Sequence, residues 1–108
     1  MNKLFVYGTL GPGRPNEHIL KNIGGSFKKA YVIGELFEEG WGADAGFPGI
    51  RLENKIEKVE GFLFESDAMN NHWQVLDDFE GDAYHRVLTT VFLAGKQSQT
   101  QAFIYVLK

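Results

Sequence analysis

The chain has 108 residues and a formal net charge of -3 at pH 7, and its 44% hydrophobic and 14% aromatic content suits one folded domain over residues 1–108. It has no cysteine, which excludes disulfides, zinc–thiolate sites and thiol nucleophiles, and its basic residues are scattered apart from Lys28-Lys29, which argues against nucleic acid as a partner. The N-terminal apolar run is too short for a signal peptide and no run could span a membrane, so we expect a cytoplasmic protein.

The first predicted strand runs from Leu4 to Leu10, and its nearly continuous apolar character indicates burial on both faces at the centre of a sheet. A block rich in Gly and Pro then predicts a loop, followed by a helix of about two turns that starts at Asn16 and stops at Gly24. Such a junction of strand, loop and helix suits a carboxylate, phosphate or developing oxyanion. The pattern is also typical of a plain turn, because it lacks the spacing of a dinucleotide or phosphate loop.

The middle of the chain combines a long strand pattern with an irregular segment. Residues Phe27–Glu38 predict a strand in which Gly34 marks a bulge or a sharp bend. The segment Glu39–Gly49 is rich in glycine yet contains Trp41 and Phe47. Since surface loops seldom contain two large aromatic residues, we expect this segment to fold over another part of the protein.

Two more strands and a second helix are predicted next. Ile50–Glu53 predicts a short strand, and Val59–Glu65 a longer one whose residues alternate between two faces. A helix capped by Ser66 or Asp67 and ended by Gly81 should follow, because apolar residues recur at helical spacing: Met69, Trp73, Leu76 and Phe79. Acidic residues in its last turn oppose the helix macrodipole and reduce stability unless another role requires them: Asp77, Asp78 and Glu80.

The last part of the chain predicts a hairpin. Tyr84–Leu93 and Thr100–Leu107 alternate as strands, with a connection at 94–98. The order of elements lacks the regular alternation of parallel strand–helix–strand units. We therefore predict an α+β fold in which five to seven strands form a small, mixed, strongly bent, barrel-like sheet with two or more short helices outside it.

Glu80 is the candidate for acid–base chemistry. It precedes the helix-breaking Gly81, so its side chain can point toward the sheet. Burial beside other acidic residues would make its carboxylate a better proton acceptor at neutral pH. The alternative is an ordinary solvated helix end.

Other kinds of site have little support in the sequence. Asp78, Glu80 and Asp82 lack the spacing of a calcium loop, and the three histidines lack ligand partners at helical or hairpin spacing, so we expect neither a metal nor a cofactor. No serine lies on the glycine-flanked elbow that a triad nucleophile uses. We expect the alternating aromatic residues in the core, with the exception of Tyr105.

Two pairs of motifs carry a family resemblance. The first pair is FVYGTL at Phe5–Leu10 with GxPN at Gly13–Asn16, and the second is LDDFEG at Leu76–Gly81 with Tyr84-His85-Arg86 behind it. Together they resemble the gamma-glutamylcyclotransferase-like family, above all the AIG2-like branch that contains gamma-glutamylamine cyclotransferase. The resemblance spans nearly the whole chain. It implies a small mixed barrel with a cavity at its mouth, and a small gamma-glutamyl compound as the binding partner.

The same resemblance implies roles for individual residues. Glu80 matches the catalytic carboxylate of the family. The implied substrate-binding residues are Tyr7, Gly8, Thr9, Leu10, Tyr84, Arg86 and Tyr105. The segment Glu39–Gly49 matches no family pattern, so the leaving group of the substrate stays open.

The implied chemistry explains why no nucleophile motif is needed. A gamma-glutamyl amide carries its own nucleophile, because its α-amine can attack the γ-carbonyl and close the five-membered ring of 5-oxoproline. The resemblance thus implies an enzyme that releases 5-oxoproline and a free amine or amino acid, with Glu80 as general acid and base. The alternatives are a non-catalytic module that binds a carboxylate-bearing metabolite in the same pocket, and a structural or interaction role.

Overall fold

The computed structural model describes residues 1–39 and 48–108. The strands of these residues are, in chain order, β1 (Lys3–Val6), β2 (Ser26–Phe37), β3 (Gly49–Arg51), β4 (Glu57–Glu65), β5 (Tyr84–Leu93) and β6 (Gln99–Leu107). The helical elements are α1 (Glu17–Ile23), the 3-10 turn η2 (Met69–Asn71) and α2 (Trp73–Glu80). The predicted α+β class is confirmed.

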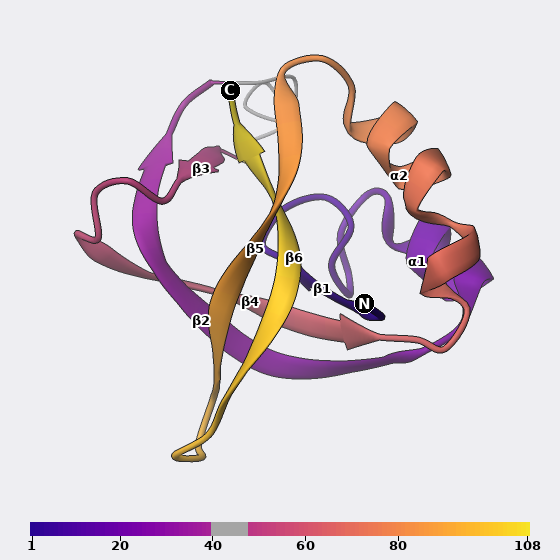
Figure 1. Cartoon of the computed structure of the whole chain (residues 1–108), viewed down its shortest axis with the longest axis horizontal. Helices are drawn as coiled ribbons and strands as arrows, with labels where there is room; N and C mark the ends of the chain where they lie inside the picture. The colour runs from indigo at the N-terminus through magenta and orange to yellow at the C-terminus, as the bar shows by residue number, and fades with distance from the viewer. Residues whose placement is uncertain (40–47) are drawn as a thin grey trace.

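Five strands close into a small barrel (Figure 1). The hydrogen-bonded order is β3-β2-β4-β1-β6-β5, and a further pairing of β2 with β5 closes the ring and leaves β3 as an extension beside β2. Neighbouring strands are antiparallel except β1 and β6, which run parallel. The prediction of a mixed, barrel-like sheet is therefore confirmed.

The apolar residues form two clusters on either side of the barrel wall. One draws on all six strands and fills the barrel: Phe5, Ala30, Val32, Ile50, Val59, Leu63, Val91, Ala102, Ile104 and Val106. The other joins the outer face of the barrel to the helical elements: Leu4, Val6, Leu10, Leu20, Phe64, Met69, Leu76, Tyr84, Tyr105 and Leu107. Both helices lie on the same side of the barrel (Figure 1), packed outside it as predicted.

β1 lies between β4 and β6 and is buried on both faces, as its sequence predicts. Phe5 points into the barrel cluster, whereas Leu4 and Val6 belong to the cluster under the helices. The strand ends at Val6, four residues earlier than predicted. The backbone turns there, because the N–H of Gly11 donates to the carbonyl of Gly8 at 3.2 Å.

β2 is continuous through Gly34, where the sequence predicts a bulge or bend. The strand instead changes partner at this residue: Gly34 pairs with Glu57 of β4, and Glu35 pairs with Arg51 of β3. A Cβ at Gly34 would lie 3.0 Å from the carbonyl oxygen of Arg51. The close approach of the two backbones accounts for the glycine.

The helix predicted after Ser66 is divided into η2 and α2. The Oγ of Ser66 accepts a hydrogen bond from the N–H of Ala68 at 3.1 Å and donates one to the carbonyl of Gly24, so Ser66 caps the turn before η2 and ties it to the end of α1. α2 ends at Glu80 and is followed by Gly81, whose φ of 81° favours glycine.

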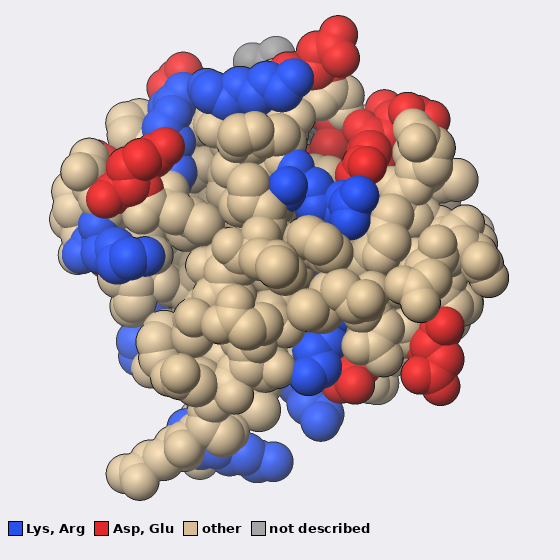
Figure 2. All heavy atoms as spheres, viewed as in Figure 1, with Lys and Arg blue, Asp and Glu red and all other residues tan. Residues whose placement is uncertain are grey.

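Two further outcomes concern the loop and the surface. Of the predicted segment Glu39–Gly49, residues 40–47 with Trp41 and Phe47 lie outside the described residues. Within the described ranges, no helix has the length and apolar character to cross a membrane. Basic and acidic side chains are interspersed on the face shown in Figure 2, and much of the surface over β5 and β6 carries neither.

Candidate active site

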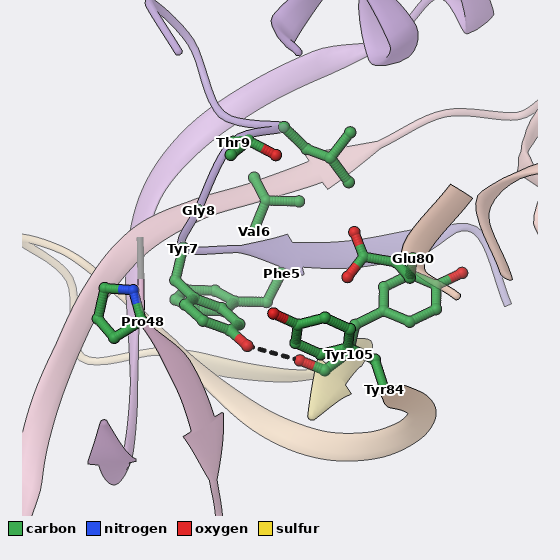
Figure 3. Close-up of a pocket in the computed structure, with 10 residues that line it drawn as sticks. Phe5, Val6, Tyr7, Gly8, Thr9, Pro48, Glu80, Tyr84 and Tyr105 are labelled. Carbon is green, nitrogen blue, oxygen red and sulfur yellow. Dashed lines mark hydrogen bonds between the residues drawn. The ribbon is translucent and has the colours of Figure 1, made fainter. Parts of the chain in front are cut away.

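A cavity lies at the point where β1 ends, next to the end of α2 and the start of β5 (Figure 3). The described residues that line it are Phe5, Val6, Tyr7, Gly8, Thr9, Leu10, Pro48, Glu80, Tyr84 and Tyr105. The loop that follows the first strand and the acidic end of the second helix are 70 positions apart in the sequence, from Leu10 to Glu80. The fold brings them together around one cavity.

The loop after β1 forms its side of the cavity without help from a helix. α1 begins only at Glu17, so the dipole of a helix start is not at the cavity, in contrast to the predicted junction of strand, loop and helix. Turn hydrogen bonds fix the loop instead, since the carbonyls of Gly8 and Thr9 accept from the N–H groups of Gly11 and Asn16 at 3.2 and 2.8 Å.

Glu80 is the last residue of α2, and its side chain points into the cavity (Figure 3). Burial disfavours the charged carboxylate and raises the pKa of Glu80 to about 7. The sequence predicts a raised pKa from burial together with acidic neighbours, and burial is the cause in the structure. A carboxyl group with this pKa can accept a proton and return it at neutral pH.

Tyr7 connects the loop to two distant strands. Its hydroxyl donates a hydrogen bond to the carbonyl of Tyr105 at 2.8 Å and accepts one from the N–H of Ile50 at 3.1 Å. Burial raises the pKa of the Tyr7 hydroxyl far above its usual value, so the group stays neutral. Tyr7 therefore fixes the start of the loop with an uncharged donor.

A second network lies behind the cavity wall. Asp77 of α2 accepts a 2.6 Å hydrogen bond from the hydroxyl of Tyr105, and two from Arg86, at 2.9 Å from Nε and 3.2 Å from Nη2. The guanidinium of Arg86 also lies over the rings of Trp73 and Phe103, at 4.6 and 4.5 Å from their centroids. Burial opposes the ionisation of Asp77, but the hydrogen bonds from Arg86 and Tyr105 outweigh it and lower the pKa of Asp77.

Not all of the residues that the sequence indicates for the site lie at the cavity. Those that line the cavity are Tyr7, Gly8, Thr9, Leu10, Glu80, Tyr84 and Tyr105. Arg86 is not among the described residues on the cavity wall, and its side chain binds Asp77, which in turn accepts a hydrogen bond from Tyr105 on the wall. Sequence reasoning did not assign roles to Asp77 and Pro48. A signal existed for Asp77, because an acid in the last turn of a helix needs a compensating partner; none existed for Pro48.

The described residues offer no metal centre, since residues 1–39 and 48–108 contain no group of three or more His, Cys, Asp or Glu side chains placed to hold an ion.

Comparison with known proteins supplies the family. The family model described as "Gamma-glutamyl cyclotransferase, AIG2-like" matches residues 4–108. The chain belongs to this family. A curated relative, the gamma-L-glutamyl-butirosin B gamma-glutamyl cyclotransferase of Niallia circulans, is 33% identical over 69 residues, which are 64% of this chain and 42% of that protein.

Solved structures of similar proteins share the fold. An AIG2-like protein from Mus musculus has a TM-score of 0.76 at 27% identity, over 98% of this chain and 76% of that one. YkqA from Bacillus subtilis has a TM-score of 0.72 at 27% identity, over 99% of this chain and 36% of that one. The chain thus spans less than half the length of the curated relative and of YkqA. These likenesses agree with the AIG2-like fold implied by the sequence motifs.

Proposed function

We propose that this protein releases 5-oxoproline and a free amine or amino acid from a gamma-glutamyl amide. The observation that carries the proposal is the shared cavity: Glu80, whose carboxyl group has a pKa of about 7, and the loop from Tyr7 to Leu10 line the same cavity. Membership of the family and the activity for which the Niallia circulans relative is named support the same class of reaction.

Glu80 carries a proton between the two nitrogens of the substrate in the proposed reaction. Its carboxylate removes a proton from the α-ammonium of the substrate, and the freed nitrogen attacks the γ-carbonyl carbon to form the new C–N bond of the lactam. Glu80 then gives that proton to the nitrogen of the leaving group as the original amide C–N bond breaks. The lactam nitrogen gives up its second proton, and the released amine takes up one proton from the solvent and leaves as an ammonium. A pKa near the working pH serves both steps, because the same group must accept and donate the proton.

The loop holds the substrate while the ring closes. We assign the backbone N–H groups of Gly8, Thr9 and Leu10 as hydrogen-bond donors to the α-carboxylate or to the oxyanion that forms on the γ-carbonyl. A donor of this kind typically lowers the barrier by about 3 kcal/mol. Holding the chain of the substrate curled adds a proximity contribution, because the attack is intramolecular.

Tyr84 and Tyr105 flank the proposed substrate, whereas Arg86 acts indirectly through other residues. Tyr84 and Tyr105 are nearly fully buried on the cavity wall, with 8% and 5% of their surfaces exposed. Arg86 holds Asp77, and Asp77 holds the hydroxyl of Tyr105. We assign Arg86 as a positioning residue for Tyr105.

The decisive assay measures 5-oxoproline release from a panel of gamma-glutamyl amines and amino acids. Glu80→Gln keeps the size of the side chain and removes the base, so activity should fall by at least about 100-fold. Asp78→Asn is the matched control, because Asp78 is an exposed acid in the same helix turn. Equal activity of wild type and Glu80→Gln would overturn the assignment. Ligand-induced thermal stabilisation without turnover in the wild type would instead indicate a binding module.

A further inference from the structure

A second hollow adjoins the candidate active site at the loop after β1. We call it the basic groove, and among the described residues it is lined by the charged side chains Arg14, Lys29, Lys58 and Glu60 and by the aromatic rings of Tyr31 and Phe62. Val6, Tyr7 and Gly8 line both the basic groove and the active-site cavity. The two hollows therefore share lining residues at the end of β1 and the start of the loop that the proposed function assigns to the glutamyl group.

The described part of the basic groove is predominantly positive. Its three basic side chains come from three elements, since Arg14 is in the loop, Lys29 in β2 and Lys58 in β4, and they face one carboxylate, Glu60. A smaller hollow continues this lining toward the site, because it has Arg14, Lys58 and Glu60 on its wall together with Tyr7 and Pro48, which also line the active-site cavity.

Lys58 has the best-defined position of these groups. Its Nζ lies 4.3 Å from the centroid of the Tyr31 ring, and Tyr31 is stacked on Phe92 at 5.2 Å between centroids. The ammonium–ring contact restricts the side chain and leaves the ammonium at the wall of the basic groove. The ammonium can donate further hydrogen bonds, because it has three N–H donors.

The substrate geometry links the two hollows. The leaving nitrogen is bonded to the γ-carbonyl, which has to lie within reach of Glu80 and the loop for the ring to close. The rest of the leaving group must then extend out of the glutamyl cavity. The basic groove is the adjoining space that shares the loop wall, and its charge favours anions and disfavours cations.

We propose that the basic groove binds the leaving half of the substrate and selects one that carries a carboxylate. On this inference, which rests on the proposed function, the substrates are gamma-glutamyl amino acids or short acidic gamma-glutamyl peptides, and gamma-glutamyl polyamines are poor substrates. Lys58 is the specificity residue.

The test compares three substrates that differ in the charge of the leaving group: gamma-glutamylglutamate, gamma-glutamylethylamide and gamma-glutamylputrescine. Wild type should prefer the acidic compound to the uncharged one in kcat/KM, and the uncharged one to the cationic one. Lys58→Gln should reduce the ratio of acidic to uncharged kcat/KM by about fivefold, mainly through KM, because an exposed cation contributes a modest, screened attraction. Salt at about 0.5 M should reduce the wild-type ratio for the same reason.

Lys28→Gln is the matched control, since Lys28 is an exposed lysine beside Lys29 in β2 that does not line the basic groove. It removes the same charge from the protein and should leave the ratio within about twofold of wild type. An equal change in both variants, or a wild-type preference for the putrescine compound, would overturn the inference.

Binding to Glu80→Gln separates this inference from the proposed function. Calorimetric titration of that variant with the three compounds measures affinity without turnover. If wild type releases 5-oxoproline from none of the three compounds, the proposed function fails. The inference is then tested by affinity alone: it requires that the Glu80→Gln variant bind gamma-glutamylglutamate most tightly and that Lys58→Gln weaken this binding. Absence of binding by all three compounds would overturn it.

Discussion

The hydroxyl of Tyr7 donates a 2.8 Å hydrogen bond to the backbone carbonyl of Tyr105, a residue 98 positions further along the chain. The same hydroxyl accepts the N–H of Ile50 in β3 at 3.1 Å. One oxygen atom thus joins the loop after β1 to β3 and to β6 at the wall of the cavity. The position of the proposed substrate loop depends on this oxygen as well as on the turn that follows it.

Tyr7→Phe should therefore reduce both stability and activity. The substitution leaves the N–H of Ile50 and the carbonyl of Tyr105 without this partner, which should lower the free energy of unfolding by about 1–3 kcal/mol. Urea unfolding measures the loss, and amide exchange of Ile50 should accelerate. Tyr31→Phe is the control for stability, because Tyr31 is a half-exposed residue that interacts through its ring. Similar losses in the two variants would contradict the bridging role of Tyr7.

The pH profile of the proposed reaction should report Glu80. The base must be ionised to take the first proton, so kcat/KM for 5-oxoproline release should rise with pH through an apparent pKa of about 7. Initial rates over a range of pH values measure this limb, and Asp78→Asn should retain it. A profile that is flat down to about pH 5, near the ordinary pKa of a glutamate, would show that another group is the base.

Glu80 should also make stability depend on pH. Its pKa is about 7 in the folded protein against 4.5 for the ordinary group, so the folded state binds more protons between these values and its stability falls as pH rises through this window. The fall is at most about 3–4 kcal/mol, since one pKa unit corresponds to about 1.4 kcal/mol. Relative to wild type, Glu80→Gln should gain stability from about pH 5 to about pH 8 in chemical denaturation. A constant difference between the two proteins would refute the raised pKa.

Asp77→Asn should weaken the support of Tyr105. Asparagine keeps the shape but loses the charge that Arg86 and Tyr105 bind, and the pair is partly solvated, so we expect a loss of about 1–2 kcal/mol together with lower activity. Asp78→Asn provides the comparison, because Asp78 accepts only a surface hydrogen bond from Gln74 at 2.9 Å in the same helix. Thermal unfolding and the release assay measure the two effects. An Asp77 variant as stable and active as the Asp78 variant would remove the positioning role.

Gly61→Ala should destabilise the barrel. A Cβ at Gly61 would collide with the carbonyl oxygen of Val6 and would lie 2.8 Å from the ring of Phe5, so β4 and β1 would have to separate. Overpacking of this kind typically costs about 1–3 kcal/mol. Gly11→Ala is the control, because its nearest neighbour would be the carbonyl oxygen of Gly8 at an ordinary 3.5 Å. Equal midpoints of urea unfolding for the two variants would contradict the close strand packing.

The strands and helices could be predicted largely from local patterns, because alternation and capping act within a few residues. The run Tyr84–Leu93 was predicted with the bounds of β5, and α1 differs from the predicted helix only at its ends. The same local pattern gives a strand that is too long in the run from Leu4 to Leu10. Its apolar residues are buried throughout, but after Val6 they contact the cavity and the helix-side core from a turn rather than a strand.

Relationships between distant residues could not be derived from periodicity. Nothing in the pattern of β1 indicates that it lies beside β6 in parallel, or that the hydroxyl of Tyr7 reaches the carbonyl of Tyr105. The contact of Arg86 with Asp77 could not be predicted either. Its separation from Asp77 by nine residues matches no helical or hairpin spacing, and only the crossing of α2 and β5 brings the two together.

The parallel pairing of β1 with β6 has a consequence for synthesis of the chain on the ribosome. The first strand can pair with β4 once residue 65 has emerged, but its other edge stays open until β6 is made. Tyr105, which supplies both a wall of the cavity and the acceptor for Tyr7, belongs to that strand. The pocket is therefore incomplete until the barrel closes. We expect a chain that terminates before β6 to expose an unpaired strand edge, which chaperones and proteases recognise.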